Sequence, residues 1–363
     1  MNILLLATDA YGGHGGIAYY NRCLAEALAE IPAVKCIHLL PRIVKQAPEH
    51  MPAKVNFVAR AAGGKRHYLH ALAAQLFKPC QLVICGHINL LPLAAAVSWL
   101  KRVPLVLQVH GIDVWQPPKP LNRWCLARVS AVWAVSHFTQ QRMNQWAKLP
   151  PGRFTVIPNT IHPERYGMAP KRPDLLQRYG LQGKKVILTL ARLDARERYK
   201  GIDEILETLP SLLQQEPSLC YLIAGDGEDQ ARLAAKAKQL GVSDHVVFAG
   251  YVPEADKADL LRLADVFAMP GRGEGFGIVY LEAMACGVPV VGSLLDGSRD
   301  ALKNGELGQL VNPDDPVSLQ AGLLQALLVP KQIPAGLQDF AWPAFAQRVS
   351  HALKPWLATL RTQ

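Results

Sequence analysis

The sequence lacks several features that would assign it to a protein class at once. Its seven cysteines are odd in number and include no Cys-x-x-Cys pair, which favours a reducing, cytosolic compartment over a disulfide scaffold. It contains no low-complexity tract and no internal repeat. Its longest uncharged stretch, residues 79–100, is interrupted by two prolines and a glycine. These interruptions favour a strand followed by a helix over a membrane-spanning helix.

Other missing patterns exclude further classes. The glycine-rich loop at 9–16 does not have Gly-x-Gly-x-x-Gly spacing, and no acidic residue ends the next apolar run, so a dinucleotide-binding dehydrogenase is not expected. The first seven residues carry no basic leader or cleavage site and predict a strand, not a signal peptide. The acidic segments 226–229 and 314–315 stand outside any converging cluster, so we interpret them as turns and not as metal ligands.

Negative charge is scarce in the first part of the chain. Residues 1–165 hold 18 Lys and Arg against 6 Asp and Glu, a net charge of +12. The remaining residues hold 21 against 23, a net charge of −2. The positive charge is therefore concentrated in one part, which favours an anionic partner there.

The chain is long enough for two domains, and its apolar runs alternate with helical patterns. The most informative stretch, residues 264–291, predicts a glycine-rich loop and a helix between two buried strands. The first strand is the apolar run 264–269, and residues 278–286 contain good helix formers. Gly287 stands where a left-handed helix end is expected, and residues 288–291 predict the next strand.

This loop is suited to bind an anion that also carries hydroxyl groups. Its glycines allow a close approach of backbone, and the first N–H groups of a helix point outward unpaired. The amides concerned belong to Phe276, Gly277, Ile278 and Val279. A nucleotide sugar offers a diphosphate to these amides, sugar hydroxyls to Glu274 and ribose hydroxyls to Glu282. The alternative is that both glutamates are solvated and the glycines only form a turn.

The same run resembles the Glu-x7-Glu motif of retaining glycosyltransferases of family 4, which have the GT-B fold. Glu274 and Glu282 match the two acids, and the Glu-Ala-Met-Ala-x-Gly-x-Pro-Val tail matches the flank. The resemblance covers most of the chain. It implies two Rossmann-like, doubly wound parallel-sheet α/β domains that face a cleft, a nucleotide-sugar donor, and transfer with retention. It also implies that no metal or other cofactor is required.

The resemblance assigns roles to further residues. Arg192 and Lys200 match the pair that binds the donor diphosphate, where fixed cations stabilise the charge that collects on the leaving group. His110 follows the strand predicted at 104–109 and matches a histidine that contacts the transferred sugar. The other donor-binding positions implied by the match are Gly15, Gly16, Tyr251 and Val252.

We expect residues 1–163 with the C-terminal helix 345–363 to form the acceptor domain, and residues 164–344 to bind the donor. The predicted reaction is retaining, metal-independent transfer of a mannose- or glucose-type hexose from a GDP- or UDP-sugar. The expected acceptor is a saccharide or a polyprenyl-diphosphate-linked saccharide of bacterial surface-polysaccharide assembly. Two alternatives are a nucleotide-sugar epimerase or phosphorylase of the same fold, and a non-catalytic nucleotide-sugar-binding protein. Backbone contacts to the base leave no side-chain signature that separates GDP from UDP.

Residues 65–78 predict an amphipathic helix with two interpretations. The apolar residues at helical spacing are Tyr68, Leu69, Leu72, Leu76 and Phe77. Their basic neighbours are Arg60, Lys65, Arg66 and His67. One interpretation is a core-facing helix with a solvated basic end. The other is a surface that binds an anionic membrane and is extended by residues 99–102. On the second interpretation the protein is cytoplasmic and peripheral on the inner face of the plasma membrane. No nucleic-acid partner is expected.

Overall fold

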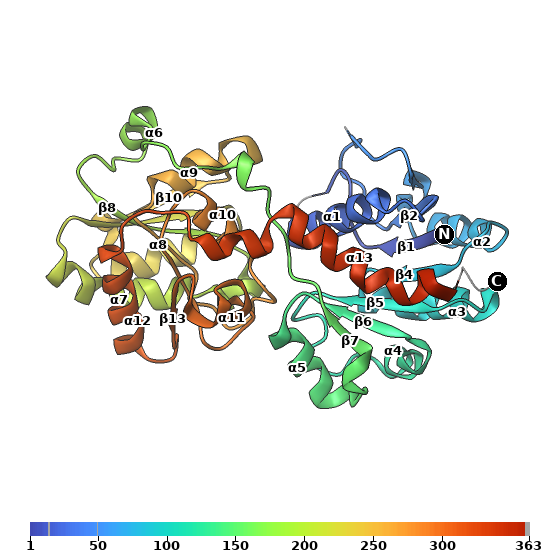
Figure 1. Cartoon of the computed structure of the whole chain (residues 1–363). Helices are drawn as coiled ribbons and strands as arrows, with labels where there is room; N and C mark the ends of the chain where they lie inside the picture. Colours follow the sequence, from blue (N-terminus) through green and yellow to red (C-terminus); the bar gives the residue numbers. More distant parts are fainter. Residues whose placement is uncertain (14, 49, 360–363) are drawn as a thin grey trace. The chain divides into compact units, whose positions relative to one another are not determined.

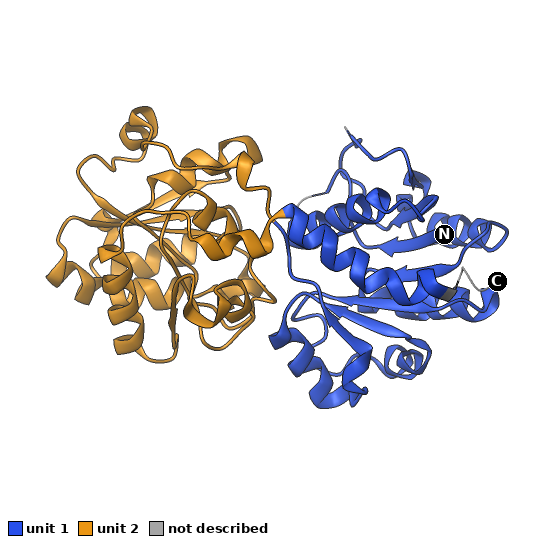
Figure 2. Ribbon diagram, in the orientation of Figure 1, with its two compact units in different colours: residues 1–160, 342–363 blue, residues 161–341 orange. Residues whose placement is uncertain are grey.

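The computed structural model describes residues 1–13, 15–48 and 50–359, and the chain forms two compact units (Figures 1 and 2). Unit 1 consists of Met1–Thr160 and Trp342–Gln363, and unit 2 of Ile161–Ala341. The divisions predicted from the sequence are at 163/164 and 344/345. The end of the predicted C-terminal helix, residues 360–363, lies outside the described residues.

Unit 1 is built on a seven-stranded, fully parallel sheet in the order β3-β2-β1-β4-β5-β6-β7. Its strands are β1 Asn2–Ala7, β2 Cys36–Pro41, β3 Val55–Phe57, β4 Leu82–Cys85, β5 Leu105–Val109, β6 Ala131–Ala134 and β7 Phe154–Val156. Its helices are α1 Gly16–Glu30, α2 Lys65–Leu76, α3 Leu91–Lys101, α4 Pro120–Cys125, α5 His137–Ala147 and α13 Trp342–Thr359. Short 3-10 helices are η1 Ala59–Ala62, η2 Ile88–Leu90, η3 Leu126–Arg128 and η4 Pro151–Arg153.

Unit 2 has a six-stranded parallel sheet in the order β10-β9-β8-β11-β12-β13. Its strands are β8 Lys185–Leu190, β9 Leu219–Ala224, β10 Val246–Gly250, β11 Val266–Ala268, β12 Val290–Ser293 and β13 Gln309–Val311. Its helices are α6 Pro173–Arg178, α7 Ile202–Gln215, α8 Gln230–Gln239, α9 Lys257–Leu263, α10 Ile278–Ala285, α11 Ser298–Ala301 and α12 Pro316–Leu328. Its 3-10 helices are η5 Pro163–Arg165, η6 Ala195–Lys200, η7 Ser243–His245, η8 Glu254–Asp256, η9 Lys303–Gly305 and η10 Ala335–Phe340.

The central strands form because their residues are almost all apolar and are covered on both faces, as parallel sheets require. Every residue of β4, β5, β9 and β11 is buried. The helix α13 returns the chain to unit 1 and packs along α1, where the rings of Tyr20 and Phe345 meet edge to face with centroids 5.8 Å apart. The result is two separate hydrophobic cores, one for each sheet.

Both sheets are doubly wound, because the next two strands in sequence lie on one side of the first strand and all the later strands lie on its other side. The order reverses between β1 and β4 in unit 1, and between β8 and β11 in unit 2. Open parallel sheets bind ligands beyond the carboxyl ends of the strands that flank such a reversal. The two switch points therefore indicate where each unit can hold a ligand. The predicted doubly wound α/β fold is confirmed.

The helix predicted at residues 65–78 is present as α2, but its five predicted apolar positions do not all face the core. Tyr68 and Leu72 are buried, but Leu69 and Phe77 are exposed, with Phe77 91% exposed. Residues 66, 69, 70, 73 and 77 form one outer stripe of the helix and its end, at the i, i+3, i+4, i+7 spacing that places side chains on one face. This stripe mixes apolar side chains with Arg66 and His70.

Candidate active site

The switch point of unit 2 brings together the segments that follow β8 and β11. Arg192 lies just after β8, and the loop after β11 contains Glu274 and leads into α10. A backbone hydrogen bond of 2.8 Å from Arg272 N–H to the Tyr199 carbonyl joins the two segments. The tertiary fold therefore places the predicted cations and the predicted carboxylate loop at one edge of the sheet.

The start of α10 has the geometry of an anion-binding helix end. Gly277 takes a left-handed conformation, with φ of 88°, and turns the chain into the helix. The N–H groups of Ile278 and Val279 have no hydrogen-bond acceptor within the described parts of the chain, and both residues are half-buried. The Phe276 side chain is buried against Phe340, with ring centroids 5.5 Å apart, so only its backbone can meet a ligand.

Glu274 is held by backbone contacts that the sequence analysis missed. Its N–H donates to the Asp296 carboxylate at 3.0 Å, and its carbonyl accepts from Gly297 N–H at 2.7 Å. Asp296 is fully buried and accepts from the Ser298 hydroxyl at 2.6 Å. Burial raises the pKa of Asp296 to about 7, while the hydrogen bonds from Ser298 and Glu274 oppose this change. The turn after β12 thus fixes the loop that carries Glu274.

The two predicted diphosphate-binding cations are paired with carboxylates. The Lys200 Nζ lies 3.4 Å from Glu274 Oε2 and 3.8 Å from Glu197 Oε2, and Arg192 donates to Glu197 Oε1. Burial acts to lower the pKa of Lys200, but the charges of Glu274 and Glu197 raise it above its ordinary value, so the ammonium stays charged. Glu197 is a second residue that the sequence analysis did not identify.

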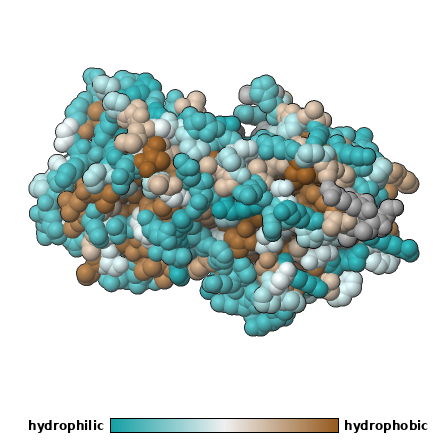
Figure 3. Space-filling view, viewed as in Figure 1, coloured by the Kyte–Doolittle hydropathy of each residue, from teal (hydrophilic) through white to brown (hydrophobic). Residues whose placement is uncertain are grey.

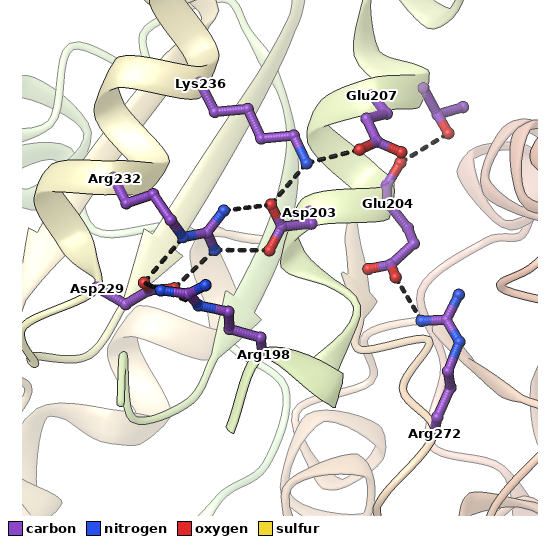
Figure 4. A network of polar contacts seen from close by, with 9 residues as sticks. Arg198, Asp203, Glu204, Glu207, Asp229, Arg232, Lys236 and Arg272 are labelled. Atoms are coloured by element: carbon purple, nitrogen blue, oxygen red, sulfur yellow. Dashed lines mark hydrogen bonds and ion pairs between the residues drawn. The ribbon is translucent and has the colours of Figure 1, made fainter. Parts of the chain in front are cut away.

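Charged residues behind this edge anchor the segment that carries Lys200 (Figure 4). Arg198 donates to Asp229 at 2.8 Å, and Arg232 binds both Asp229 and Asp203, the latter through two bonds of 2.7 Å. Separately from this network, Arg272 pairs with Glu204 of α7. Asp229 is therefore an ion-pair partner, and the interpretation of 226–229 as a simple turn was incomplete.

Glu282 lies one turn inside α10, as predicted, and one of its oxygens is already occupied. Its Oε1 accepts from the Tyr166 hydroxyl at 3.0 Å and from Lys257 Nζ at 2.9 Å. Lys257 also binds Glu254 at 2.7 Å. No bond to Glu282 Oε2 is present among the described residues, so this oxygen is available to accept from a diol. Tyr166 and Lys257 act as positioning residues for it.

The remaining donor positions in unit 2 follow β10. Gly250 ends the strand, and its carbonyl accepts from Gly225 N–H at 2.8 Å. Tyr251 is exposed and Val252 is half-buried, so neither residue is enclosed in the core. Among the described residues, no group of three or more His, Cys, Asp or Glu side chains is arranged to hold a metal ion.

His110 lies directly after β5, at the carboxyl edge of the unit 1 sheet. Its Nε2 is 2.9 Å from the carbonyl oxygen of Gly86, which follows β4. Because a carbonyl oxygen can only accept, Nε2 carries the proton. Burial lowers the pKa of His110 to about 4, so the ring is neutral at pH 7. Its Nδ1 is then a hydrogen-bond acceptor, as a contact to a sugar hydroxyl requires.

The predicted glycines of unit 1 lie at the start of α1. Gly15 precedes the helix, Gly16 is its first residue, and both are exposed. The Gly15 carbonyl accepts the first helical bond, from Tyr19 N–H at 3.0 Å. The loop before them is tied to α1 because Arg22 donates to the Gly13 carbonyl at 2.8 Å. Unit 1 thus presents an ordered helix start after β1 and a neutral imidazole after β5.

Two family profiles match the chain, one in each unit. The profile described as Glycosyltransferase Family 4 matches residues 14–165. The profile described as Glycosyl transferases group 1 matches residues 171–333. The two matches together include all the site residues predicted from the sequence, and leave out Tyr166.

Two relatives show how far the similarity extends. The chain is 32% identical over 269 residues to the GDP-mannose-dependent alpha-(1-6)-phosphatidylinositol monomannoside mannosyltransferase of Mycolicibacterium smegmatis, over 69% of each chain. It is 42% identical over 169 residues to the phosphatidyl-myo-inositol mannosyltransferase of Mycobacterium tuberculosis. The second alignment covers 46% of this chain and 42% of that relative.

Two solved structures show the same fold. Anabaena Alr3699/HepE in complex with UDP and glucose gives a TM-score of 0.74 at 23% identity, over 97% of this chain and 99% of that one. Sucrose-phosphate synthase from Thermosynechococcus elongatus gives 0.77 at 20% identity, over 99% of both chains. At these identities the likeness shows a shared fold.

Proposed function

We propose that this chain, which belongs to the group 1 glycosyl transferases of glycosyltransferase family 4, transfers mannose from GDP-mannose to a membrane lipid headgroup. Its two doubly wound units are the GT-B fold, and it is a glycosyltransferase. The observation that supports the proposed donor site is the meeting of Arg192, Lys200, Glu274 and the free amides of α10 at one switch point. The M. smegmatis relative, named for GDP-mannose and a phosphatidylinositol mannoside, supports the substrates.

In the proposed complex each group of unit 2 has one partner on the donor. Arg192, Lys200 and the N–H groups of Ile278 and Val279 bind the diphosphate, and each charge-assisted bond contributes about 1.5–3 kcal/mol. Glu274 accepts from hydroxyls of the mannose. The unoccupied Oε2 of Glu282 accepts from the ribose diol. A nucleotide sugar supplies all three kinds of partner, which an inorganic phosphate does not.

We further propose that the transfer retains the anomeric configuration and needs no metal. The bond between the anomeric carbon and the diphosphate oxygen breaks, and the acceptor oxygen bonds to the same face of the sugar. The acceptor proton passes to the leaving diphosphate. Arg192 and Lys200 stabilise the charge that grows on that leaving group, which is the role a divalent cation has in other transferases. The neutral His110 accepts from a hydroxyl of the transferred sugar.

The proposed acceptor is supported by a basic and apolar surface of unit 1, the α2–α3 surface, defined as residues 66, 69, 70, 73, 77, 78 and 99–102. Lys101 Nζ donates to the carbonyls of Leu76 and Lys78 at 2.9 and 2.8 Å, which ties the ends of α2 and α3 together. Phe77, Trp99 and Leu100 are exposed there, Trp99 by 68%.

The composition around this surface supports an anionic bilayer as its partner. Between residues 50 and 163 the sequence contains a single acidic residue, Asp113. Apolar and aromatic side chains that insert at the interface, flanked by cations, bind such membranes without spanning them. No described helix has the length and hydropathy that a bilayer crossing requires. The molecular face in Figure 3 is mostly hydrophilic, with hydrophobic residues in small separate groups.

Replacing both Phe77 and Trp99 with serine is expected to weaken binding to phosphatidylglycerol-containing vesicles about tenfold, because two exposed aromatic side chains no longer enter the interface. Vesicle flotation measures the bound fraction. The matched control replaces Val317 and Leu328, which are exposed on α12 of unit 2, with serine. This control should bind the vesicles as the wild type does. Equal binding to phosphatidylcholine vesicles, or equal loss in the control, would argue against the α2–α3 surface.

The donor assignment is tested by thermal shift with GDP, UDP, ADP and their sugars, on the wild type and on Glu282→Gln. A ligand at a hundred times its dissociation constant adds about 2.7 kcal/mol to the free energy of unfolding. We expect GDP and GDP-mannose to stabilise the wild type and the variant to lose most of this response. Stabilisation by UDP alone would show that the donor is a UDP-sugar and not GDP-mannose. A response without turnover would favour the non-catalytic binding protein, and phosphate-dependent release of sugar would favour a phosphorylase.

A further inference from the structure

We propose that Glu197 is an internal counter-ion that competes with the donor diphosphate for Arg192 and Lys200. Its carboxylate contacts both cations, since Oε1 accepts from Arg192 and Oε2 lies 3.8 Å from Lys200 Nζ. Carboxylate and phosphate oxygens are alternative acceptors for the same guanidinium and ammonium donors. The inference rests on the proposed donor site, and it assigns that site a residue which regulates its affinity.

The surroundings of Glu197 indicate that it does not simply belong to a satisfied ion pair. The residue is in η6, where its φ of −113° and ψ of 24° interrupt the helical conformation. Its side chain is only 13% exposed, yet Oε2 is buried and accepts no hydrogen bond from the described residues. Arg192, in contrast, is 75% exposed and can turn toward a ligand. The ion pair therefore joins a largely buried carboxylate, which lies on the same segment as Lys200, to an exposed guanidinium that can exchange this acceptor for another.

The charges at this edge make competition the expected outcome. With Glu197 in place, Arg192 and Lys200 face Glu197 and Glu274, so the four charges cancel. The neighbouring Arg196 and Arg198 do not alter this balance, because they pair with Asp194 and Asp229. A nucleoside diphosphate carries more than one negative charge and enters a site with no net positive charge. If Glu197 leaves the two cations, the diphosphate meets a positive site.

This arrangement has a consequence for turnover. A carboxylate that returns to Arg192 and Lys200 replaces the bonds of the departing nucleoside diphosphate, so it lowers the cost of product release. Removing the carboxylate should therefore tighten product binding and slow release. The contrary role is distinguishable by experiment. If Glu197 held some of the five N–H donors of Arg192 while the rest bind phosphate, it would orient the cations, and its removal would weaken binding.

The test is isothermal titration of GDP and UDP into the full-length wild type, Glu197→Gln and Glu197→Ala. We expect both variants to bind the preferred nucleotide about tenfold more tightly, and GDP to inhibit transfer at a correspondingly lower concentration. The matched control is Glu207→Gln, which removes a carboxylate that pairs with Lys236 on α7 and α8, away from Arg192. This control changes the net charge equally and should leave the affinity unchanged.

The outcomes separate this inference from the proposed function. Unchanged or weaker nucleotide binding by the Glu197 variants, with normal binding by the wild type, would overturn the counter-ion role and leave the donor site intact. An equal gain in Glu207→Gln would also overturn it, because the effect would then come from net charge alone. If neither GDP nor UDP binds to any of the proteins, the proposed donor site itself is wrong.

Discussion

Replacing Lys200 with methionine is expected to lower kcat/KM for sugar transfer about a hundredfold. The change removes a cation that stabilises the leaving diphosphate, and a charge-assisted bond of about 3 kcal/mol corresponds to slightly more than that factor. The substitution also leaves Glu274 and Glu197 without their shared counter-charge at a largely buried position. Because unpaired buried charge is unfavourable, the melting temperature should fall as well. Initial rates with GDP-mannose and a thermal melt measure the two effects.

The control for this prediction is Lys185→Met in the same unit. Lys185 is the first residue of β8, at the end of the strand opposite the site. It is 46% exposed and pairs with Glu216. An exposed ion pair contributes at most about 1 kcal/mol, so this variant should keep nearly full activity and stability. A Lys200→Met enzyme with wild-type kcat/KM would show that the diphosphate is bound elsewhere.

Replacing Gly297 with alanine is expected to reduce both stability and activity, because no space exists for a side chain there. A Cβ at Gly297 would lie 2.1 Å from the Gly275 carbonyl oxygen and 2.8 Å from that of Glu274. Both obstacles are backbone atoms, so the loop that carries Glu274 must move. Overpacking of this kind costs about 1–3 kcal/mol of stability. A displacement of about 1 Å at a reacting group lowers the rate about a hundredfold.

Gly152→Ala is the matched control for Gly297→Ala. No atom lies within 4 Å of a Cβ built at Gly152, and its φ is outside the left-handed range. This variant should melt and turn over as the wild type does. If Gly297→Ala instead kept its melting temperature and its kcat/KM, the contact between Gly297 and the Glu274 loop could not be what positions that carboxylate.

The sequence was sufficient for the parts of this protein that depend on local pattern. The apolar runs predicted the parallel strands, and the stretch 264–291 predicted β11, the glycine loop, α10 and β12 in their observed order. Gly287 takes the expected left-handed conformation, with φ of 75°. The Ser136 hydroxyl caps α5 by accepting from Thr139 N–H at 3.0 Å, as serine at a helix start commonly does. Each of these features is encoded by residues close together in the chain.

The groups that position the site could not be predicted in this way. Asp296 meets the Glu274 loop only because β12 pairs with β11, and Tyr166 reaches Glu282 across 116 positions of sequence. Glu197 stands between two other charged residues, and nothing in its neighbours distinguishes it from a solvated glutamate. The exposure of Phe77 likewise depends on which face of α2 the unit 1 core covers. These contacts are products of tertiary structure.

The proposed reaction is transfer of mannose from GDP-mannose to a lipid headgroup with retention. The most direct measurement uses GDP-mannose labelled with 13C in the sugar, incubated with vesicles that contain phosphatidylinositol. NMR of the extracted lipid then reports whether mannose has been transferred and which anomer is present. A lipid-linked α-mannoside is expected, formed without added divalent metal and about a hundredfold more slowly by Lys200→Met. A β-mannoside, or no labelled lipid from an enzyme that binds GDP-mannose, would contradict it.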